Sequence, residues 1–196
     1  KKDHFKKAIC PEGEMLIVHT SNFRKVKRIG DVIQVFYNIQ KEIPAKLLMI
    51  GDGPERVGAE QQCRDLGICN NIRFLGKLEA VEEGLSVADL FLMPSEKESF
   101  GLAALEAMAC EVPVISSNTG GIPELNSQGV TGFLSNVGDI EDMTRKALFV
   151  LDKNNLPRFK QNALNRAKEF DVSRILPQYE EYYARVIQKT NVNAIR

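Results

Sequence analysis

The sequence lacks the cysteine and histidine patterns that hold metal ions or stabilise small secreted domains. Its four cysteines include no pair with C-x-x-C spacing, and only two histidines occur among the 196 residues. Because zinc and iron–sulfur sites need such clusters, the composition disfavours a metal centre. We therefore expect reduced thiols, which are typical of a cytoplasmic protein.

An excess of one charge and long apolar runs are also missing. Basic and acidic residues number 26 each, so no overall field attracts nucleic acid or an anionic membrane surface. No apolar run approaches the ~20 residues of a membrane span. The N-terminal KKDHFKKAIC has no apolar segment behind it that would form a signal peptide. We expect a cytoplasmic protein with no nucleic-acid partner and no membrane span.

The sequence does contain short apolar runs, which are separated by segments of helical periodicity. Six runs have the length of strands: 14–20, 46–51, 71–76, 89–94, 112–117 and 131–134. Such continuously apolar runs are typical of parallel strands buried on both faces. Helices are expected between and after them, at 28–43, 55–66, 80–87, 100–109, 140–152 and 157–169. The alternation predicts an α/β fold with a doubly wound, six-stranded, Rossmann-like parallel sheet.

Polar or glycine-rich loops follow four of these expected strands. Four cations lie between residues 24 and 28, after the first strand, and GDGPE (51–55) follows the second. PSEKESFG (94–101) and SNTGGIPE (117–124) follow the fourth and fifth. Because ligands of open α/β sheets bind beyond the carboxyl ends of the strands, these loops predict a site for a phosphorylated ligand.

Two glutamates eight positions apart mark one of these loops and the helix after it. We expect Phe100, Gly101 and Leu102 to form the first helical turn, whose amides have no partner within the helix. Glu98 could then accept hydrogen bonds from sugar hydroxyls, and Glu106 could bind a vicinal diol such as a ribose. The alternative is a surface cap and a solvated helix residue, because this spacing alone is common. The sequence that follows, ALEAMACEVPVISSNTGGIPE, favours the ligand interpretation.

Several motifs resemble those of retaining GT-B glycosyltransferases, the large group that includes sucrose and glycogen synthases. They are GDGPE (51–55), RFLGKL (73–78), ADLFLMPSEKESFGLAALEAMA (88–109), VPVISSNTGGIPEL (112–125) and GVTGFL (129–134). The resemblance covers almost the whole chain, but only the C-terminal, donor-binding half of a two-domain enzyme. HTSNFRKVKRIGDVI (19–33) and RAKEFDVSRILPQYEEYY (166–183) resemble a branch that acts in bacillithiol biosynthesis. That branch transfers N-acetylglucosamine from its UDP donor to L-malate.

The resemblance implies roles for individual residues in binding a UDP-sugar. Glu98 would hold hydroxyls of the donor sugar and Glu106 the ribose, and the backbone near Leu78 would face the uracil. The amides of residues 100–102 would face the sugar and the diphosphate. Gly51 and Gly53, in the glycine loop after the second strand, are further donor-binding candidates.

Cations are implied to assist departure of the diphosphate. Arg24 and Lys27 would neutralise its charge, so we count them with Glu98 as catalytic candidates. Asn22 stands where many relatives have the first phosphate-binding arginine, which leaves open whether Asn22 or Arg24 fills that position. No D-x-D metal motif occurs. We therefore expect no cofactor and no obligatory metal.

The resemblance divides the chain into residues 1–172, a donor-binding domain, and residues 173–196, a helix returning to an N-terminal acceptor domain. On that basis this chain alone would bind the donor without transferring its sugar. Two alternatives stay open: a nucleotide-sugar epimerase or hydrolase on the same fold, and a non-catalytic nucleotide-sugar binding module. For His19, at the end of the first strand, packing within the core is favoured over facing the ligand.

Overall fold

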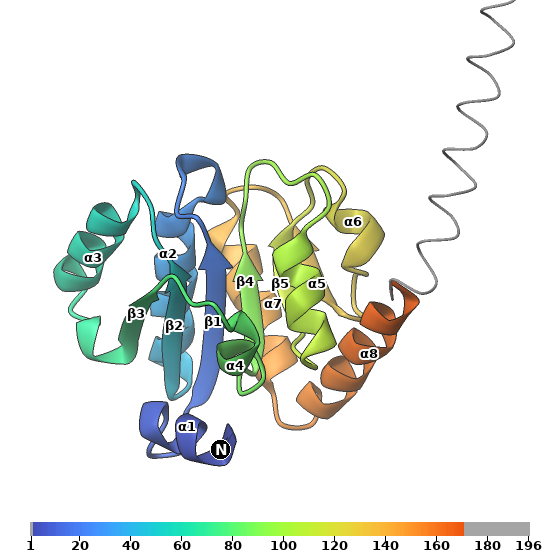
Figure 1. The fold of residues 1–196 in the computed structure, drawn as a ribbon, viewed down its shortest axis with the longest axis horizontal. Helices are drawn as coiled ribbons and strands as arrows, with labels where there is room; N and C mark the ends of the chain where they lie inside the picture. The colour runs from blue at the N-terminus through green and yellow to red at the C-terminus, as the bar shows by residue number, and fades with distance from the viewer. Residues whose placement is uncertain (1, 171–196) are drawn as a thin grey trace, which may run out of the picture.

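A six-stranded sheet runs through the middle of residues 2–170, the part of the chain that the computed structural model describes (Figure 1). Its strands are β1 (Met15–Ser21), β2 (Ala45–Gly51), β3 (Ile72–Gly76), β4 (Leu90–Met93), β5 (Val114–Ser117) and β6 (Gly132–Ser135). Neighbouring strands are all parallel, in the order β3-β2-β1-β4-β5-β6. The predicted doubly wound α/β sheet is confirmed, with one strand in each apolar run.

Helices cover both faces of the sheet. They are α1 (Lys2–Ile9), α2 (Ile29–Glu42), α3 (Arg56–Asp65), α4 (Val81–Leu85), α5 (Leu102–Ala109), α6 (Ile122–Leu125), α7 (Ile140–Leu151) and α8 (Leu156–Glu169), with 3-10 turns η1 (Lys25–Lys27) and η2 (Cys69–Asn71). One core cluster packs α2, α3 and α7 against the sheet, and the other packs α4, α5 and α6 against the opposite face. In Figure 1, α4 and α5 accordingly lie in front of the sheet and α2 and α7 behind it.

Helix α1 is an element that the sequence patterns do not predict. Most of its residues are charged or exposed, and only Ile9 is buried. Its few apolar residues, Phe5, Ala8 and Ile9, have helical spacing, but the segment is short and polar overall. Its position depends on a long-range contact instead. The Lys6 ammonium donates to both carboxylate oxygens of Asp89, at 3.0 Å each, at the start of β4. A tertiary ion pair of this kind leaves no local signal in the sequence.

The strand order creates a crevice between β1 and β4. Strand β1 lies between β2 and β4, and the helices that follow β1 and β4 lie on opposite faces of the sheet. The loops that leave these two strands therefore diverge at the carboxyl edge, the place where open α/β sheets bind ligands. In Figure 1 this edge is at the top and α1 is at the bottom.

The helix expected over 173–196, and the domain boundary at residue 172, lie outside the described residues. Within residues 2–170, no helix combines the length and apolar character needed to cross a membrane.

Candidate functional site

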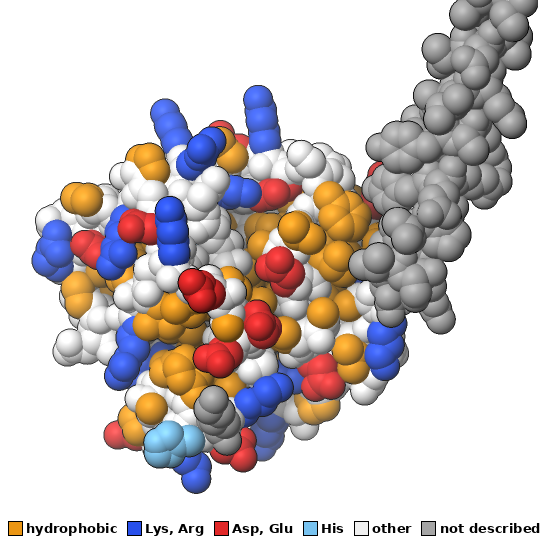
Figure 2. Space-filling view, viewed as in Figure 1, with side chains coloured by type: hydrophobic (Ala, Val, Ile, Leu, Met, Phe, Trp, Pro, Cys, Tyr) orange, Lys and Arg blue, Asp and Glu red, His pale blue; other side chains and the backbone are white. Residues whose placement is uncertain are grey.

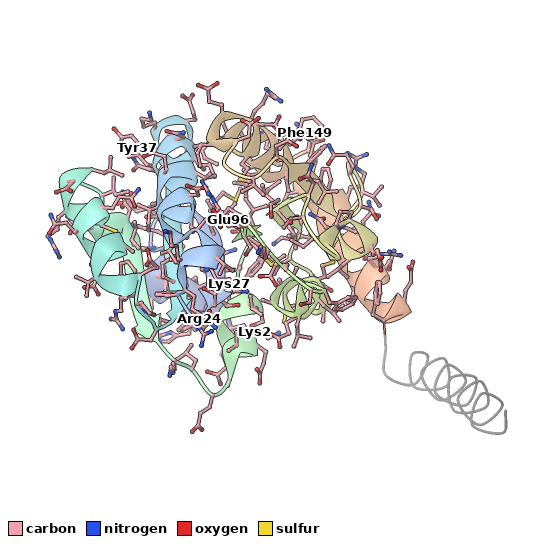
Figure 3. All side chains as sticks on the ribbon, turned by 90° about the horizontal axis from the view of Figure 1, so that it is seen from above. Lys2, Arg24, Lys27, Tyr37, Glu96 and Phe149 are labelled. Carbon is pink, nitrogen blue, oxygen red and sulfur yellow. The ribbon has the colours of Figure 1, made fainter. Side chains whose placement is uncertain are left out.

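The carboxyl edge carries a polar cavity of about 360 Å³. It is lined by Lys27 from the loop after β1, by residues 97–99 from the loop after β4, and by Thr119 and Gly120 from the loop after β5. Lys and Arg side chains project from this edge in Figure 2, and Figure 3 views it from above, with Arg24 and Lys27 labelled. Three of the four loops that the sequence predicts to share one edge line this cavity.

Lys27 and Glu98, two of the predicted site residues, are in direct contact across the crevice. The Lys27 ammonium donates a hydrogen bond to Oε1 of Glu98. The same oxygen accepts a hydrogen bond of 3.0 Å from the Ser95 hydroxyl. The Lys27 and Glu98 side chains are 23% and 13% exposed, so the pair is largely enclosed but open to the cavity. An ion pair thus joins the loop after β1 to the loop after β4.

The loop after β5 packs tightly against the loop that carries Glu98. Gly121 N donates to Glu98 O at 3.2 Å. A Cβ atom on Gly120 would lie 1.8 Å from Glu98 O, and one on Gly121 would lie 2.2 Å from Ser99 O. Both distances are far inside van der Waals contact, so this close approach of two backbones requires glycine at both positions.

The start of α5 differs from the prediction by two residues. The helix begins at Leu102, and Gly101 precedes it with φ of 86°, a left-handed conformation that suits glycine. Phe100 also lies before the helix, and its ring packs edge-on against Phe170 with 5.5 Å between centroids. The expectation that residues 100–102 form the first turn is therefore wrong for Phe100 and Gly101. The unpartnered amides of α5 belong to its own first turn, from Leu102 onwards.

Glu106 lies on the exposed side of α5. Its pKa is raised, first by partial burial and then by the negative charge of Glu82 on α4. Among the described residues, no positive charge is a cause of this pKa shift. The Glu106 carboxylate oxygens can therefore still accept hydrogen bonds from a ligand. Its assignment to a ribose stays a prediction, as does the assignment of Glu98 to sugar hydroxyls.

The remaining candidates lie around this centre. Arg24 and Asn22 are both exposed in the loop after β1, so which of them contacts the first phosphate stays open. Leu78 is half-buried and packs against the core cluster under α4 and α5. A Cβ atom on Gly51 or Gly53 would lie 1.8 Å from Ser21 O or 2.0 Å from Asn22 O respectively. These glycines therefore allow the loop after β2 to support the loop after β1, in addition to any contact with a ligand.

His19 is packed within the core, as the favoured interpretation holds. It is fully buried, and its ring nitrogens contact Leu92 O and Ser21 Oγ, both at 2.8 Å. Sequence reasoning missed Ser95, which bonds Glu98, and Lys97 and Thr119, which line the cavity. The sequence feature that could have identified them is their position in the loops that follow β4 and β5.

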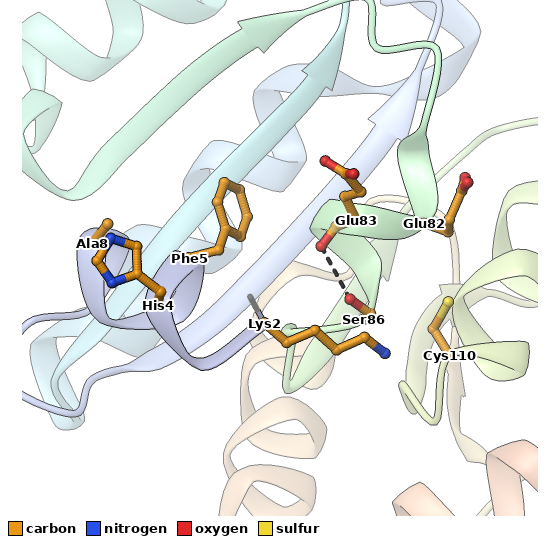
Figure 4. A pocket seen from close by; sticks show the side chains of 8 residues that line it. All are labelled: Lys2, His4, Phe5, Ala8, Glu82, Glu83, Ser86 and Cys110. Atoms are coloured by element: carbon orange, nitrogen blue, oxygen red, sulfur yellow. Dashed lines mark hydrogen bonds between the residues drawn. The ribbon is translucent and has the colours of Figure 1, made fainter.

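A larger cavity, of about 550 Å³, lies between α1, α4 and the end of α5 (Figure 4). Its lining includes Phe5, Ala8 and Cys110, together with polar side chains such as Ser86, whose hydroxyl donates to Glu83 O at 3.1 Å. Size does not make it the candidate site, because α1 places it toward the opposite edge from the carboxyl-end loops. Convergent polar groups at a switch point are the stronger indication of a ligand site.

Sequence comparisons relate the chain to known glycosyltransferases. The family model described as glycosyl transferases group 1 matches residues 1–166. The N-acetyl-alpha-D-glucosaminyl L-malate synthase of Bacillus anthracis is 46% identical over 182 residues, covering 90% of this chain and 47% of that protein. The trehalose synthase of Thermococcus litoralis is 32% identical over 177 residues, covering 84% of this chain and 42% of that protein.

Structural comparison gives the same fold. The Anabaena protein HepE, in complex with UDP, superposes with a TM-score of 0.85 at 25% identity, covering 93% of this chain and 52% of that one. The chain thus spans about half the length of the relatives it matches. The family model matches most of the chain, and the fold is that of GT-B enzymes. This chain therefore belongs to the group 1 glycosyl transferases.

Proposed function

We propose that this chain is the donor-binding half of a retaining glycosyltransferase that moves N-acetylglucosamine from a UDP donor to a hydroxyl of L-malate. The observation that carries the proposal is the meeting of Lys27 and Glu98 at the switch point, beside a polar cavity. The name of the Bacillus anthracis relative supports this donor sugar and acceptor. The HepE structures, with UDP and with UDP and glucose, support a uridine donor.

The cationic loop would stabilise the leaving group. Breaking a glycosyl–phosphate bond develops negative charge on the departing diphosphate, and Arg or Lys aimed at that charge lowers the barrier. Lys27 lies at the cavity and Arg24 is three residues away in the same loop. The diphosphate would then replace Glu98 as the partner of Lys27. Glu98, still bonded by Ser95, would be released to accept hydrogen bonds from the donor sugar.

Helix α5 would supply the remaining contacts to the donor. Its first-turn amides and the positive end of its dipole suit a phosphate or sugar oxygen. Glu106, farther along the helix, would hold the ribose diol. Retention would follow if the leaving phosphate itself assists the acceptor hydroxyl. We expect donor binding to persist in EDTA, because the charge of the diphosphate is met by side-chain cations.

Binding measurements on this chain test the proposal. Calorimetric titration with UDP, UDP-N-acetylglucosamine, UDP-glucose, GDP and NAD should show binding of the uridine ligands and none of NAD. A chain that binds none of the uridine ligands would overturn the proposal. Preference for NAD would indicate a dinucleotide enzyme instead.

Activity measurements separate the remaining alternatives. Incubated with UDP-N-acetylglucosamine and L-malate, the 196-residue chain, which spans about half the length of its relatives, should release no glycoside if the other half orients the acceptor hydroxyl. Transfer at the rate of a two-domain relative would contradict the assignment as a half-enzyme. Turnover of the donor without acceptor would favour an epimerase or hydrolase. Tight binding without turnover, even after fusion to the N-terminal half of the Bacillus anthracis relative, would favour a binding module.

A further inference from the structure

His19 lies where the sheet begins to divide. The registered pairs between β1 and β4 end at Val18 and Phe91, whereas β1 and β2 stay paired as far as Ser21 and Gly51. One residue beyond the last β1–β4 pair, Nδ1 of His19 lies 2.8 Å from Leu92 O. A side chain therefore continues the link between the two strands where their backbone pairing has ended.

The contacts of His19 fix the direction of each hydrogen bond. Leu92 O can only accept, so Nδ1 carries the proton and Nε2 of the neutral ring is an acceptor. The Ser21 hydroxyl, 2.8 Å away, donates to Nε2, and the same oxygen accepts from Phe23 N at 3.2 Å. A chain of three hydrogen bonds thus runs from the turn after β1 to the end of β4.

Burial keeps this ring neutral. It lowers the pKa of His19 to about 4, outweighing the bond to Leu92 and the charge of Glu98, which raise it, while Lys27 lowers it further. Among the described residues, the charges that shift the pKa of His19 are thus those of Lys27 and Glu98, which contact each other across the crevice. At neutral pH, His19 is an uncharged connector with a fixed tautomer.

The hydrogen-bond chain ends on a turn with an uncommon backbone conformation. Phe23 has φ of 44°, which non-glycine residues rarely adopt. Such a conformation persists only where the surroundings hold it. Here the Phe23 ring is fully buried 6.1 Å from His19, and Phe91 stacks near the same imidazole at 6.2 Å between centroids. Arg24 and η1, which contains Lys27, come immediately after this turn.

We propose that His19 is a positioning residue of the ligand site. Together with Ser21, it fixes the position of the turn at 21–23 relative to β4, the strand that leads to Glu98. The turn then sets the positions of Arg24 and Lys27. His19 does not touch the ligand, because its side chain is fully buried. The inference rests on the proposed function, in which Arg24 and Lys27 bind a diphosphate.

A matched pair of Ser21 variants tests this role by calorimetry with UDP and uridine. Ser21→Ala removes the hydroxyl that joins Phe23 N to the imidazole and leaves the histidine in place. We expect it to weaken UDP binding about tenfold and uridine binding less than about twofold, since only UDP carries the diphosphate. Ser21→Thr retains a hydroxyl and should bind UDP within about twofold of wild type. His19→Phe, which keeps a stacked ring but no polar atom, should reproduce the selective loss for UDP.

A second background distinguishes positioning from a general loss of stability. In a chain that already carries Arg24→Ala and Lys27→Ala, adding Ser21→Ala should change UDP affinity less than about twofold, because effects that act through one another are not additive. Thermal unfolding identifies variants that remain folded. Equal UDP affinity of wild type and folded Ser21→Ala, or an equal loss for uridine, would overturn the positioning role alone. If the wild-type chain binds no UDP, the proposed function is overturned, and this inference with it.

Discussion

Two carboxylates at opposite edges of the sheet contact lysines, yet their surroundings differ. At the amino edge, Asp89 accepts hydrogen bonds from Lys6 at 3.0 Å, Lys160 at 2.9 Å and Leu16 N at 2.9 Å, and its side chain is 5% exposed. At the carboxyl edge, Glu98 is bonded by Lys27 and Ser95 through one oxygen, Oε1, and borders a cavity. The same pair of chemical groups occurs in an enclosed and in an open setting.

The difference separates a structural contact from an exchangeable one. The partners of Asp89 come from α1, β1 and α8, so its carboxylate fastens two helices to the sheet. Both of its oxygens are already occupied. Among residues 2–170, the contacts of the Glu98 carboxylate are all to Oε1, and its lysine partner lines the same cavity. A ligand can therefore compete for both members of the Lys27–Glu98 pair. At the amino edge, the lysine partners Lys6 and Lys160 line a cavity of about 180 Å³, but the carboxylate of Asp89 is not among its lining groups.

The largest effect should come from removing cations at the carboxyl edge. Each charge-assisted hydrogen bond contributes roughly 1.5–3 kcal/mol, so Arg24→Ala with Lys27→Ala should weaken UDP binding by at least about 3 kcal/mol. Uridine binding should change little. The matched control is Lys6→Ala with Lys160→Ala, which removes the same charge at the amino edge and should leave UDP affinity unchanged. Equal losses for UDP and uridine would remove Arg24 and Lys27 from the site.

The reverse experiment tests the amino edge. Asp89→Ala leaves Leu16 N without its buried partner and releases α1 and α8, so the free energy of unfolding should fall by about 3 kcal/mol. UDP affinity should remain that of wild type at a temperature where the variant is folded. Glu98→Ala, the control, should reduce stability by less than about 1 kcal/mol, because Lys27 can return to solvent. Chemical denaturation measures both, and a larger loss for Glu98→Ala would contradict the comparison.

Acid should affect the two edges in different pH ranges. Burial raises the pKa of Asp89, but Lys160, Leu16 N and Lys6 together lower it below its ordinary value of 3.8, so the stability it contributes is lost only as pH falls through that region. The pKa of the His19 imidazole is 6.5 in the unfolded chain and about 4 in the folded chain. As pH falls, the unfolded state therefore takes up a proton first.

Stability should therefore fall by roughly 2 kcal/mol between pH 7 and pH 4.5 on account of His19 alone. Denaturation of wild type and His19→Phe at both pH values measures this contribution. The variant should lose roughly 2 kcal/mol less than wild type over the interval. Parallel losses in the two proteins would show that another group dominates this range.

The smallest expected effects distinguish the two glutamates of the site. Glu106→Gln should weaken binding of UDP by about tenfold, because the ribose is common to product and donor. Glu98→Gln should leave UDP affinity unchanged or slightly higher, since Lys27 loses a competing partner, and should weaken UDP-N-acetylglucosamine by about tenfold. Calorimetry with both ligands gives the comparison. The opposite pattern would mean that the ligand lies in the reverse orientation.

The sequence predicts the sheet well because its four central strands, β1, β2, β4 and β5, are largely buried on both faces and therefore largely apolar. Each of the six apolar runs forms a strand, although the edge strand β3 alternates buried and exposed residues. Helix α1 escapes prediction because a contact from Lys6 to Asp89, remote in sequence, holds it in place. The start of α5 is displaced because Gly101 adopts a left-handed conformation among Met93 and Ile122, which no local pattern records.

The candidate site is predictable only in part. Parallel strands bring all their carboxyl ends to one edge, so the sequence correctly groups the loops that hold Lys27 and Glu98. Their direct contact depends on β1 lying beside β4, which the usual order of a doubly wound sheet implies, but that order does not tell which side chains meet. The link from His19 to Leu92 depends on the same adjacency. Which residues act across the crevice is therefore visible only in the structure.

That strand order has a consequence for how the chain folds. β2 and β3 follow β1 along the sequence, and β5 and β6 follow β4, so within the described sheet only the β1–β4 pairing joins strands that are not consecutive. Pairings between distant segments form late, because a long loop must first be closed. The crevice between β1 and β4 is thus a seam between two halves that can each pair locally. A ligand that contacts both loops adds its binding free energy to the least local contact in the sheet.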